Sequence, residues 1–176
     1  MTDLRYPVGE FALTGEVTPA RLEGWIAEVA EAPAKLRAAV HGLSNEQFDT
    51  PYRPEGWTVR QVVHHIPDSH LNAYVRFKLA LTEDNPTIKP YAEDRWANLP
   101  DTKGAPIGVS LMLLESVTRR WVVLLKGLTP EQWDRTYVHP DKPGSQRLDH
   151  ILAMYAWHGK HHITQITALR DRMAWR

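Results

Sequence analysis

The chain has 176 residues, 43% of them hydrophobic, which is enough for one domain, residues 1–176, with a sizeable core. Its 21 Lys and Arg residues balance 21 Asp and Glu residues, and this zero net charge disfavours nucleic acid as a partner. The absence of cysteine excludes disulfide bonds, thiolate metal sites and cysteine nucleophiles, so any metal must take nitrogen or oxygen ligands.

The first 17 residues predict an extended arm. Pro7, Gly9 and Gly15 interrupt this segment, and its apolar residues show no helical spacing. The start of the chain lacks the apolar stretch of a signal peptide, and no later stretch reaches the length of a membrane span. We therefore expect a cytoplasmic protein that has no membrane contact.

Two long helices are predicted in the first half. One runs over residues 18–41, with Thr18 as N-cap and Pro19 at the first helical position, and Pro33 predicts a kink in it. The next runs over residues 58–82, where Pro67 predicts a bend beside a group of histidines.

Two more helices are predicted in the second half. Residues 83–108 are rich in proline and read as an irregular connection, with a short turn near residues 93–99. Apolar spacing then predicts helices over residues 109–126 and 147–173. Four amphipathic helices predict an all-α four-helix bundle, in which the long connection allows a crossover.

The sequence contains an internal repeat. Residues 42–49, Gly-Leu-Ser-Asn-Glu-Gln-Phe-Asp, match residues 127–134, Gly-Leu-Thr-Pro-Glu-Gln-Trp-Asp, at an offset of 85. Each copy follows a helix that ends at glycine and predicts a capping box, from Ser44 to Gln47 and from Thr129 to Gln132. The chain therefore reads as two helix pairs.

Clustered histidines occur on the second helix of each pair. His158 and His162 are one turn apart and share a face with the apolar residues, so both are expected to point inward and to hold one metal ion. A third ligand is expected from the earlier helix, where His65 lies closer than His64 to the apolar stripe. His161 is one position off the ligand face, so it is expected to support the ligands indirectly or to be exposed.

The remaining histidines are expected on the surface or in loops: His41, His64, His70, His139 and His150. The competing interpretation of the trio itself is a set of buried histidines satisfied by backbone or carboxylate groups.

Three neutral imidazoles would leave open positions on an ion, which is typical of catalytic rather than structural sites. Such an ion acidifies bound water or a bound substrate thiol. Gly159 follows His158, so the glutamate of the His-Glu-x-x-His metalloproteases is missing and a peptidase is disfavoured. Supporting carboxylates are candidates at Glu55, Asp68 and Asp149.

The segment Trp57-Thr58-Val59-Arg60-Gln61-Val62-Val63-His64-His65-Ile66, and the later Tyr155-Ala156-Trp157-His158 followed by His161-His162-Ile163, resemble the DinB/YfiT-like metalloenzymes, most closely the YfiT group. The resemblance extends over nearly the whole chain. It implies an up-down-down-up bundle, a homodimer, and a divalent ion, zinc or nickel, held by His65, His158 and His162. Pro67 departs from the helix-forming residue expected beside His65.

The resemblance also implies the activity. The leading hypothesis is a metal-dependent hydrolase that activates water against a small-molecule substrate. The alternative is a thiol S-transferase of the bacillithiol type, acting in detoxification, for which Arg53, Arg60 and Arg76 are candidate contacts to an anionic low-molecular-weight thiol. A third possibility is a non-catalytic metal-binding bundle. Substrate specificity is expected to lie in residues 83–108 and in the N-terminal arm.

Overall fold

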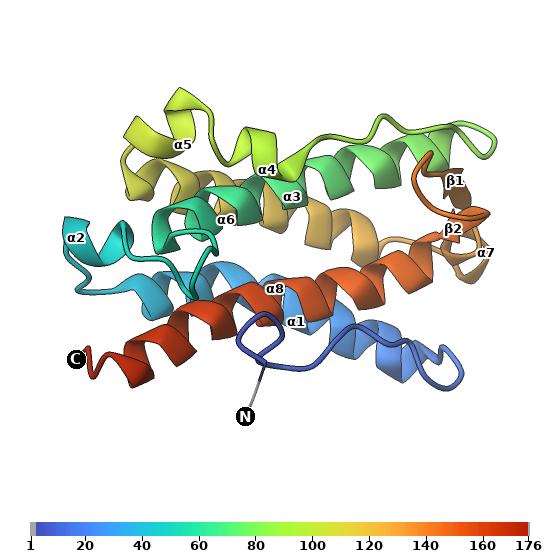
Figure 1. Cartoon of the computed structure of the whole chain (residues 1–176). Coiled ribbons are helices and arrows are strands. Elements are labelled where there is room, and N and C mark those ends of the chain that lie inside the picture. Colours follow the sequence, from blue (N-terminus) through green and yellow to red (C-terminus); the bar gives the residue numbers. More distant parts are fainter. Residues whose placement is uncertain (1–2, 176) are drawn as a thin grey trace.

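The structure, a computed structural model, describes residues 3–175. It consists mainly of four long helices (Figure 1). They are α1 (Pro19–Val40), α3 (Val59–Thr82), α6 (Ile107–Lys126) and α8 (Leu148–Arg172). In Figure 1, α1 and α8 run in one direction while α3 and α6 run in the other. Each helix packs on two neighbours, with α1 and α3 each lying between α6 and α8. The predicted four-helix bundle and its up-down-down-up topology are confirmed.

Short elements join the long helices. The crossover between α3 and α6 carries α4 (Glu93–Trp96) and α5 (Pro100–Gly104) in an otherwise irregular path. A one-turn helix follows each of the helices that open the two halves, α2 (Asn45–Phe48) after α1 and α7 (Pro130–Trp133) after α6. A two-stranded antiparallel sheet of β1 (Thr136–Val138) and β2 (Ser145–Arg147) was not predicted, because strands of three residues carry no readable periodicity.

The internal repeat is present in the structure. Both predicted capping boxes form, at Ser44 before α2 and at Thr129 before α7. The repeat also extends further than the matching letters, because the bridge between Pro51 and Thr58 occupies the place that the β1–β2 sheet has in the second half. The two halves are therefore α1–α2–α3 and α6–α7–α8.

The two prolines lie inside continuous helices. Pro33 is within α1 and Pro67 within α3, and the helix continues past each of them.

The third long helix begins at Ile107, two residues before the predicted start at Val109. The other long helices have bounds within one residue of those predicted. No helix among residues 3–175 is both long enough and apolar enough to span a membrane.

The core consists of two apolar clusters along the bundle axis. On α3, Ile66 belongs to one cluster and Ala73 to the other; on α8, Ile163 and Ala156 are divided in the same way. On both helices, the boundary between the two apolar clusters therefore lies at the level of the predicted metal-binding histidines. Polar side chains interrupt the apolar core of the bundle at this level, which is costly unless they are satisfied.

The start of α3 sets the position of His65, and its cap offers a simple test. The Thr58 side chain accepts a hydrogen bond from Gln61 N, and the Gln61 side chain accepts one from Thr58 N. Replacing Thr58 with alanine is expected to lower the free energy of unfolding by about 1 kcal/mol in urea titrations. Thr58→Ser, which keeps the hydroxyl, should lose much less; equal losses from both substitutions would contradict the capping role.

Candidate metal centre

Three histidine side chains meet between α3 and α8. His158 lies between the other two, with its Nε2 3.2 Å from His65 Nε2 and 3.1 Å from His162 Nε2. Their ligand atoms all lie within 4.8 Å of one another. The structure therefore brings together the three residues that the sequence and the resemblance selected, and it turns their Nε2 atoms toward a common centre.

These distances fit a divalent cation. Imidazole nitrogens lie about 2.0–2.1 Å from a zinc ion, which separates two of them by about 3.3 Å in a tetrahedral site. The separation is about 2.9 Å in an octahedral site. The observed 3.1 and 3.2 Å fall between these values. Hydrogen bonds do not explain the cluster equally well, because a neutral imidazole carries only one proton and His158 Nε2 has two nitrogen neighbours.

Gln165 sets the tautomer of one ligand. Its Oε1 lies 2.8 Å from His162 Nδ1, and an amide oxygen only accepts, so His162 Nδ1 carries the proton and donates it. The Nε2 lone pair of His162 is then free to face the centre. The Gln165 amide nitrogen donates to His161 Nε2 at 2.9 Å and to the backbone oxygen of Arg5 at 3.1 Å. Gln165 thus connects a candidate ligand to the N-terminal arm.

Burial keeps the candidate ligands neutral. It lowers the pKa of His65 to about 4. It also lowers the pKa of His158 and His162 well below the ordinary histidine value, and the neighbouring imidazoles add to the effect. Neutral imidazoles are the form that binds a metal, so near neutral pH no proton has to be displaced from the lone pairs.

Aromatic rings surround the three histidines. The Trp57 ring stands edge-on to His65 at 4.8 Å between centroids and lies parallel to His162 at 6.3 Å. Tyr155 stands edge-on to His158 at 5.8 Å. The Trp57 indole donates to Asp94 Oδ1 at 3.1 Å, so α4 holds this ring in place. These contacts fix the ring orientations and shield the sides of the centre from water.

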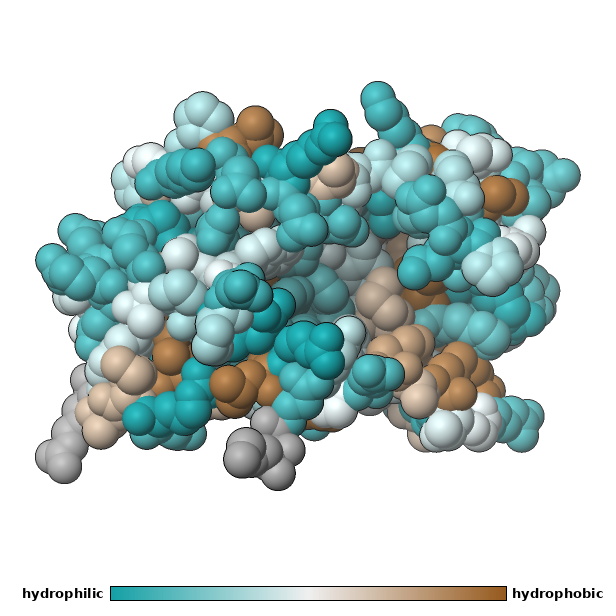
Figure 2. All heavy atoms as spheres, in the orientation of Figure 1, coloured by the Kyte–Doolittle hydropathy of each residue, from teal (hydrophilic) through white to brown (hydrophobic). Residues whose placement is uncertain are grey.

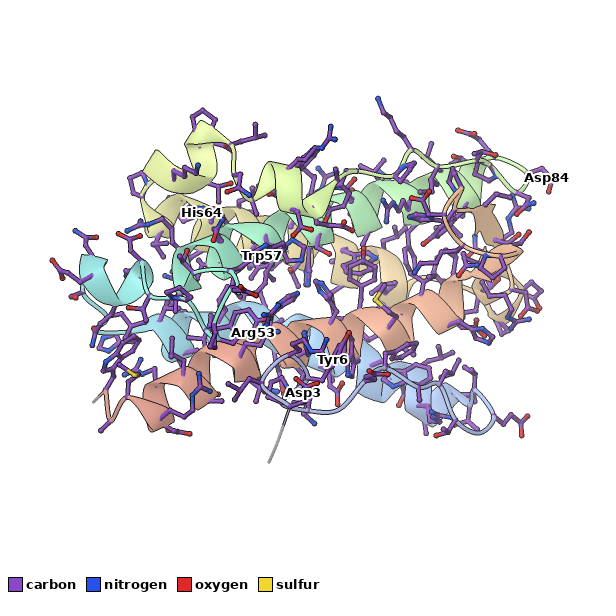
Figure 3. The ribbon with its side chains drawn as sticks, viewed as in Figure 1. Asp3, Tyr6, Arg53, Trp57, His64 and Asp84 are labelled. Carbon is purple, nitrogen blue, oxygen red and sulfur yellow. The ribbon has the colours of Figure 1, made fainter. Side chains whose placement is uncertain are left out.

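The centre is open toward the face shown in Figures 1 to 3. His65 and His162 are buried, whereas His158 keeps part of its surface exposed. Figure 2 shows a hollow in the middle of this face, between α8 and the segment that carries α4. Beside the centre, a cavity of about 420 Å³ is lined by His162, Tyr6, Arg53 and Trp57, among others. Figure 3 shows the last three side chains gathered near the middle of α8.

The N-terminal arm closes one side of this cavity. Besides the contact from Gln165 to Arg5, the Trp157 indole donates to the backbone oxygen of Gly9 at 3.1 Å. The Tyr6 ring lies 5.7 Å from the ring of His161. The predicted extended arm is therefore docked on α8 directly beside the candidate ligands.

The expectation for His64 and His70 was wrong. Both are buried, because the face of α3 that carries them packs on α6: His64 Nδ1 lies 2.6 Å from Ser110 Oγ, and His70 Nδ1 lies 2.9 Å from Thr118 Oγ1. Sequence periodicity did not reveal that α3 is covered on two sides.

The other histidines agree with expectation. His161 is buried and supports His162 through Gln165, as one of its two predicted roles requires. His41 and His150 are exposed, and His139 is half-buried in a loop.

The predicted supporting carboxylates do not bond to the three histidines. Asp149 is buried at the start of α8, where it pairs with Arg147 at 2.7 Å. Glu55 lines the cavity, and Asp68 is half-buried, which raises its pKa to about 6. Within residues 3–175, no hydrogen bond joins any of these carboxylates to His65, His158 or His162. The supporting residue is Gln165, which its spacing of three from His162 and four from His161 could have indicated.

The three candidate arginines lie in different surroundings. Arg60 pairs with Asp49 at 2.7 Å and lies over the ring of Phe48. Arg53 lines the cavity beside His162. Arg76 lies over the Tyr91 ring, with Cζ 5.9 Å from its centroid.

Substitution of Gln165 tests whether its hydrogen bond to His162 stabilises the metal centre. Gln165→Leu removes the acceptor that holds the His162 Nδ1 proton, so metal affinity is expected to fall about 10- to 100-fold, as for other residues that orient metal ligands. Isothermal titration of metal into the metal-free protein measures this change. Gln165→Glu keeps an acceptor at the same place and should retain most of the affinity. An unchanged affinity in Gln165→Leu would show that His162 needs no such support.

The sequence is similar to known proteins over its whole length. The DinB superfamily matches residues 28–166. A protein of Bacillus mycoides (strain KBAB4) is 51% identical over 175 residues, which cover 99% of this chain and 100% of the relative. A protein of Bacillus cereus (strain AH820) is 53% identical with the same coverage. Both carry the name "putative metal-dependent hydrolase".

A solved structure is also similar. YfiT from Bacillus subtilis, described as "a probable metal-dependent hydrolase with an unusual four-helix bundle topology", superposes with a TM-score of 0.95 at 47% sequence identity. The match covers 98% of this chain and 99% of that chain. The resemblance read from the histidine segments is thereby confirmed, and the chain belongs to the DinB superfamily.

Proposed function

We propose that the protein is a metal-dependent hydrolase of small molecules, in which His65, His158 and His162 hold one divalent ion, zinc or nickel. The observation that carries the proposal is the convergence of three buried or partly buried Nε2 atoms at 3.1 and 3.2 Å. The names of the relatives support the same activity.

A divalent ion at this place would supply Lewis acidity, which polarises a substrate carbonyl and makes water a better nucleophile near neutral pH. The chain itself contributes orientation. Gln165 holds the His162 ring, and Trp57 and Tyr155 pack against the ligand rings. The partial exposure of His158 and the adjacent hollow give a small molecule access to the centre. The three ligands are neutral, so a divalent ion keeps its full charge for the substrate.

The test begins with the metal content of the purified protein. We expect about one divalent ion per chain, as for a site with three protein ligands. The metal-loaded protein is then assayed against a panel of esters and amides, with the metal-free protein as control. Metal-dependent turnover supports the hydrolase. A natively folded protein that binds no divalent metal contradicts the proposal, and a protein that binds metal but turns over no substrate would favour the non-catalytic bundle.

Thiol transfer is a second candidate on the same centre. The observation that favours it is Arg53, which lines the 420 Å³ cavity beside His162 and could pair with an anionic thiol cofactor. Conjugation of a model electrophile with bacillithiol or glutathione, with and without metal, separates the two reactions. Lack of turnover with every thiol counts against transfer.

A homodimer and a cytoplasmic location belong to the same proposal, as the resemblance implies. Four exposed apolar side chains on α6 are available for a contact between copies: Val109, Met112, Leu113 and Val123, at 50%, 59%, 40% and 75% exposure. Sedimentation equilibrium tests the dimer, and a monomer at micromolar concentration would contradict it. Cell fractionation tests the location.

A further inference from the structure

Arg76, on the same helix as His65, forms no ion pair with the part of the chain that the structure describes. No Asp or Glu within residues 3–175 lies within 4.0 Å of its guanidinium. Its Nε is buried and has no hydrogen-bond partner in the same part of the chain. A buried donor on a charged group is costly to leave unpaired, so this arrangement either stores strain or awaits a ligand.

Three tyrosines from three other segments surround the guanidinium. Tyr91 comes from the crossover, Tyr137 from β1 and Tyr155 from α8. Burial raises the pKa of all three hydroxyls, and the nearby Arg76 charge opposes the shift in each. The guanidinium is also within hydrogen-bonding reach of the Tyr137 and Tyr155 oxygens. The Tyr155 hydroxyl donates to Ser69 O, so the donors left for an anion are the Arg76 guanidinium and the hydroxyls of Tyr91 and Tyr137.

This donor group adjoins the three histidines. Arg76 follows His65 by eleven residues on α3, which places both on nearly the same helix face, about 16 Å apart along the axis. Helical side chains lean toward the N-terminus, so Arg76 reaches back toward the centre. Tyr155 links the two places, because its hydroxyl donates to Ser69 O at 3.3 Å and its ring contacts His158.

We propose that Arg76 binds the carboxylate of a substrate whose reacting group lies beside His65, His158 and His162. This deepens the proposed function and rests on it for the reacting end of the substrate. A carboxylate matches a single positive charge better than a phosphate dianion does. Within residues 3–175, Arg76 is the one cation among the groups that act on the pKa of the three tyrosines, and Glu93 lies close enough to raise the pKa of Tyr91 and Tyr155. A guanidinium fork also matches a carboxylate in shape.

The experiment compares two probes of the same shape, benzoate and the neutral benzamide, on the full-length metal-free protein, so that no metal can bind the carboxylate. Binding is followed by NMR through the Nε–H resonance of Arg76, which is assigned by its loss in Arg76→Lys. We expect benzoate to move this resonance and to bind at least about tenfold more tightly than benzamide, a preference that Arg76→Gln abolishes.

Two variants serve as controls. Arg119→Gln removes an arginine from an exposed site on α6 and should leave the preference unchanged. Arg76→Lys keeps the charge without the planar fork and should keep only part of the preference. If Arg76→Gln does not fold, the wild-type resonance and Arg76→Lys still decide the question.

Three results would overturn the proposal: equal binding of the two probes, an Arg76 Nε–H resonance that does not shift when benzoate is added, or a preference for benzoate that persists in folded Arg76→Gln. Arg76 would then only pack against the tyrosines. The outcome is independent of the metal. A protein that prefers benzoate but binds no divalent ion would support the carboxylate site and contradict the proposed hydrolase. A protein that binds one divalent ion but does not prefer benzoate would support the metal centre and contradict the carboxylate site.

Discussion

Replacing His158 with alanine is expected to abolish stable metal binding and with it the proposed metal-dependent hydrolysis. His158 is the central member of the trio, since its Nε2 is the only one that lies within 3.2 Å of both others. Two imidazoles from different helices would remain, and they provide too few ligands for a stable mononuclear site. The loss should exceed the about 10- to 100-fold that follows removal of a supporting hydrogen bond.

The measurement is the metal content of the purified variant together with titration of zinc and nickel into the metal-free form. His150→Ala is the matched control, because His150 lies on the same helix but is exposed and away from the centre. Circular dichroism and urea unfolding should show that both variants fold. A His158→Ala protein that keeps one tightly bound ion would contradict the assignment of this residue.

Replacing Trp121 with alanine is expected to lower the free energy of unfolding by about 3–5 kcal/mol. This ring is fully buried on α6 and makes edge-on contacts with Phe77 and Tyr155, both at 5.3 Å between centroids, and with His70 at 5.5 Å. Its loss leaves a large cavity between α6 and the two helices that carry the histidines. Because Tyr155 contacts His158, weaker metal binding should accompany the loss of stability.

Urea unfolding of the metal-free protein measures this change without a contribution from bound metal. Trp96→Ala is the control, since Trp96 is 37% exposed on α4 and should cost about 1 kcal/mol or less. Trp121→Phe, which keeps an aromatic ring in the core, should fall between the two. A loss of about 1 kcal/mol or less in Trp121→Ala would mean that the surrounding rings close the cavity.

Local signals carried most of the fold prediction. Thr18 caps the helix that it was predicted to cap, the helix predicted from residue 58 begins directly after Thr58, and the Gly-Leu-Ser and Gly-Leu-Thr repeats form the two predicted capping boxes. Each of these signals depends on residues within one turn of one another, so the sequence shows them directly. The β1–β2 sheet was missed because its strands are stabilised by pairing with each other and by a contact to the crossover at Thr87, not by their own pattern.

The candidate site divides in the same way. The spacing of His158 and His162 is local and places both on one face of α8, whereas the choice of His65 over His64 depended on a weak stripe and on the resemblance. The structure separates the two residues by their neighbours: His64 meets Ser110 on α6, and His65 meets His158 on α8. No periodicity within α3 can tell which of two covering helices a side chain will face.

The sequence alone thus determined the four helices, their caps, the repeat and the paired histidines, because each follows from residues close together in the chain. Only the tertiary structure decided that three Nε2 atoms share one centre, that Gln165 orients His162, and that Arg76 is surrounded by tyrosines from three other segments. Those relations join residues from separate helices and loops. They depend on how the helices pack, which short-range patterns do not encode.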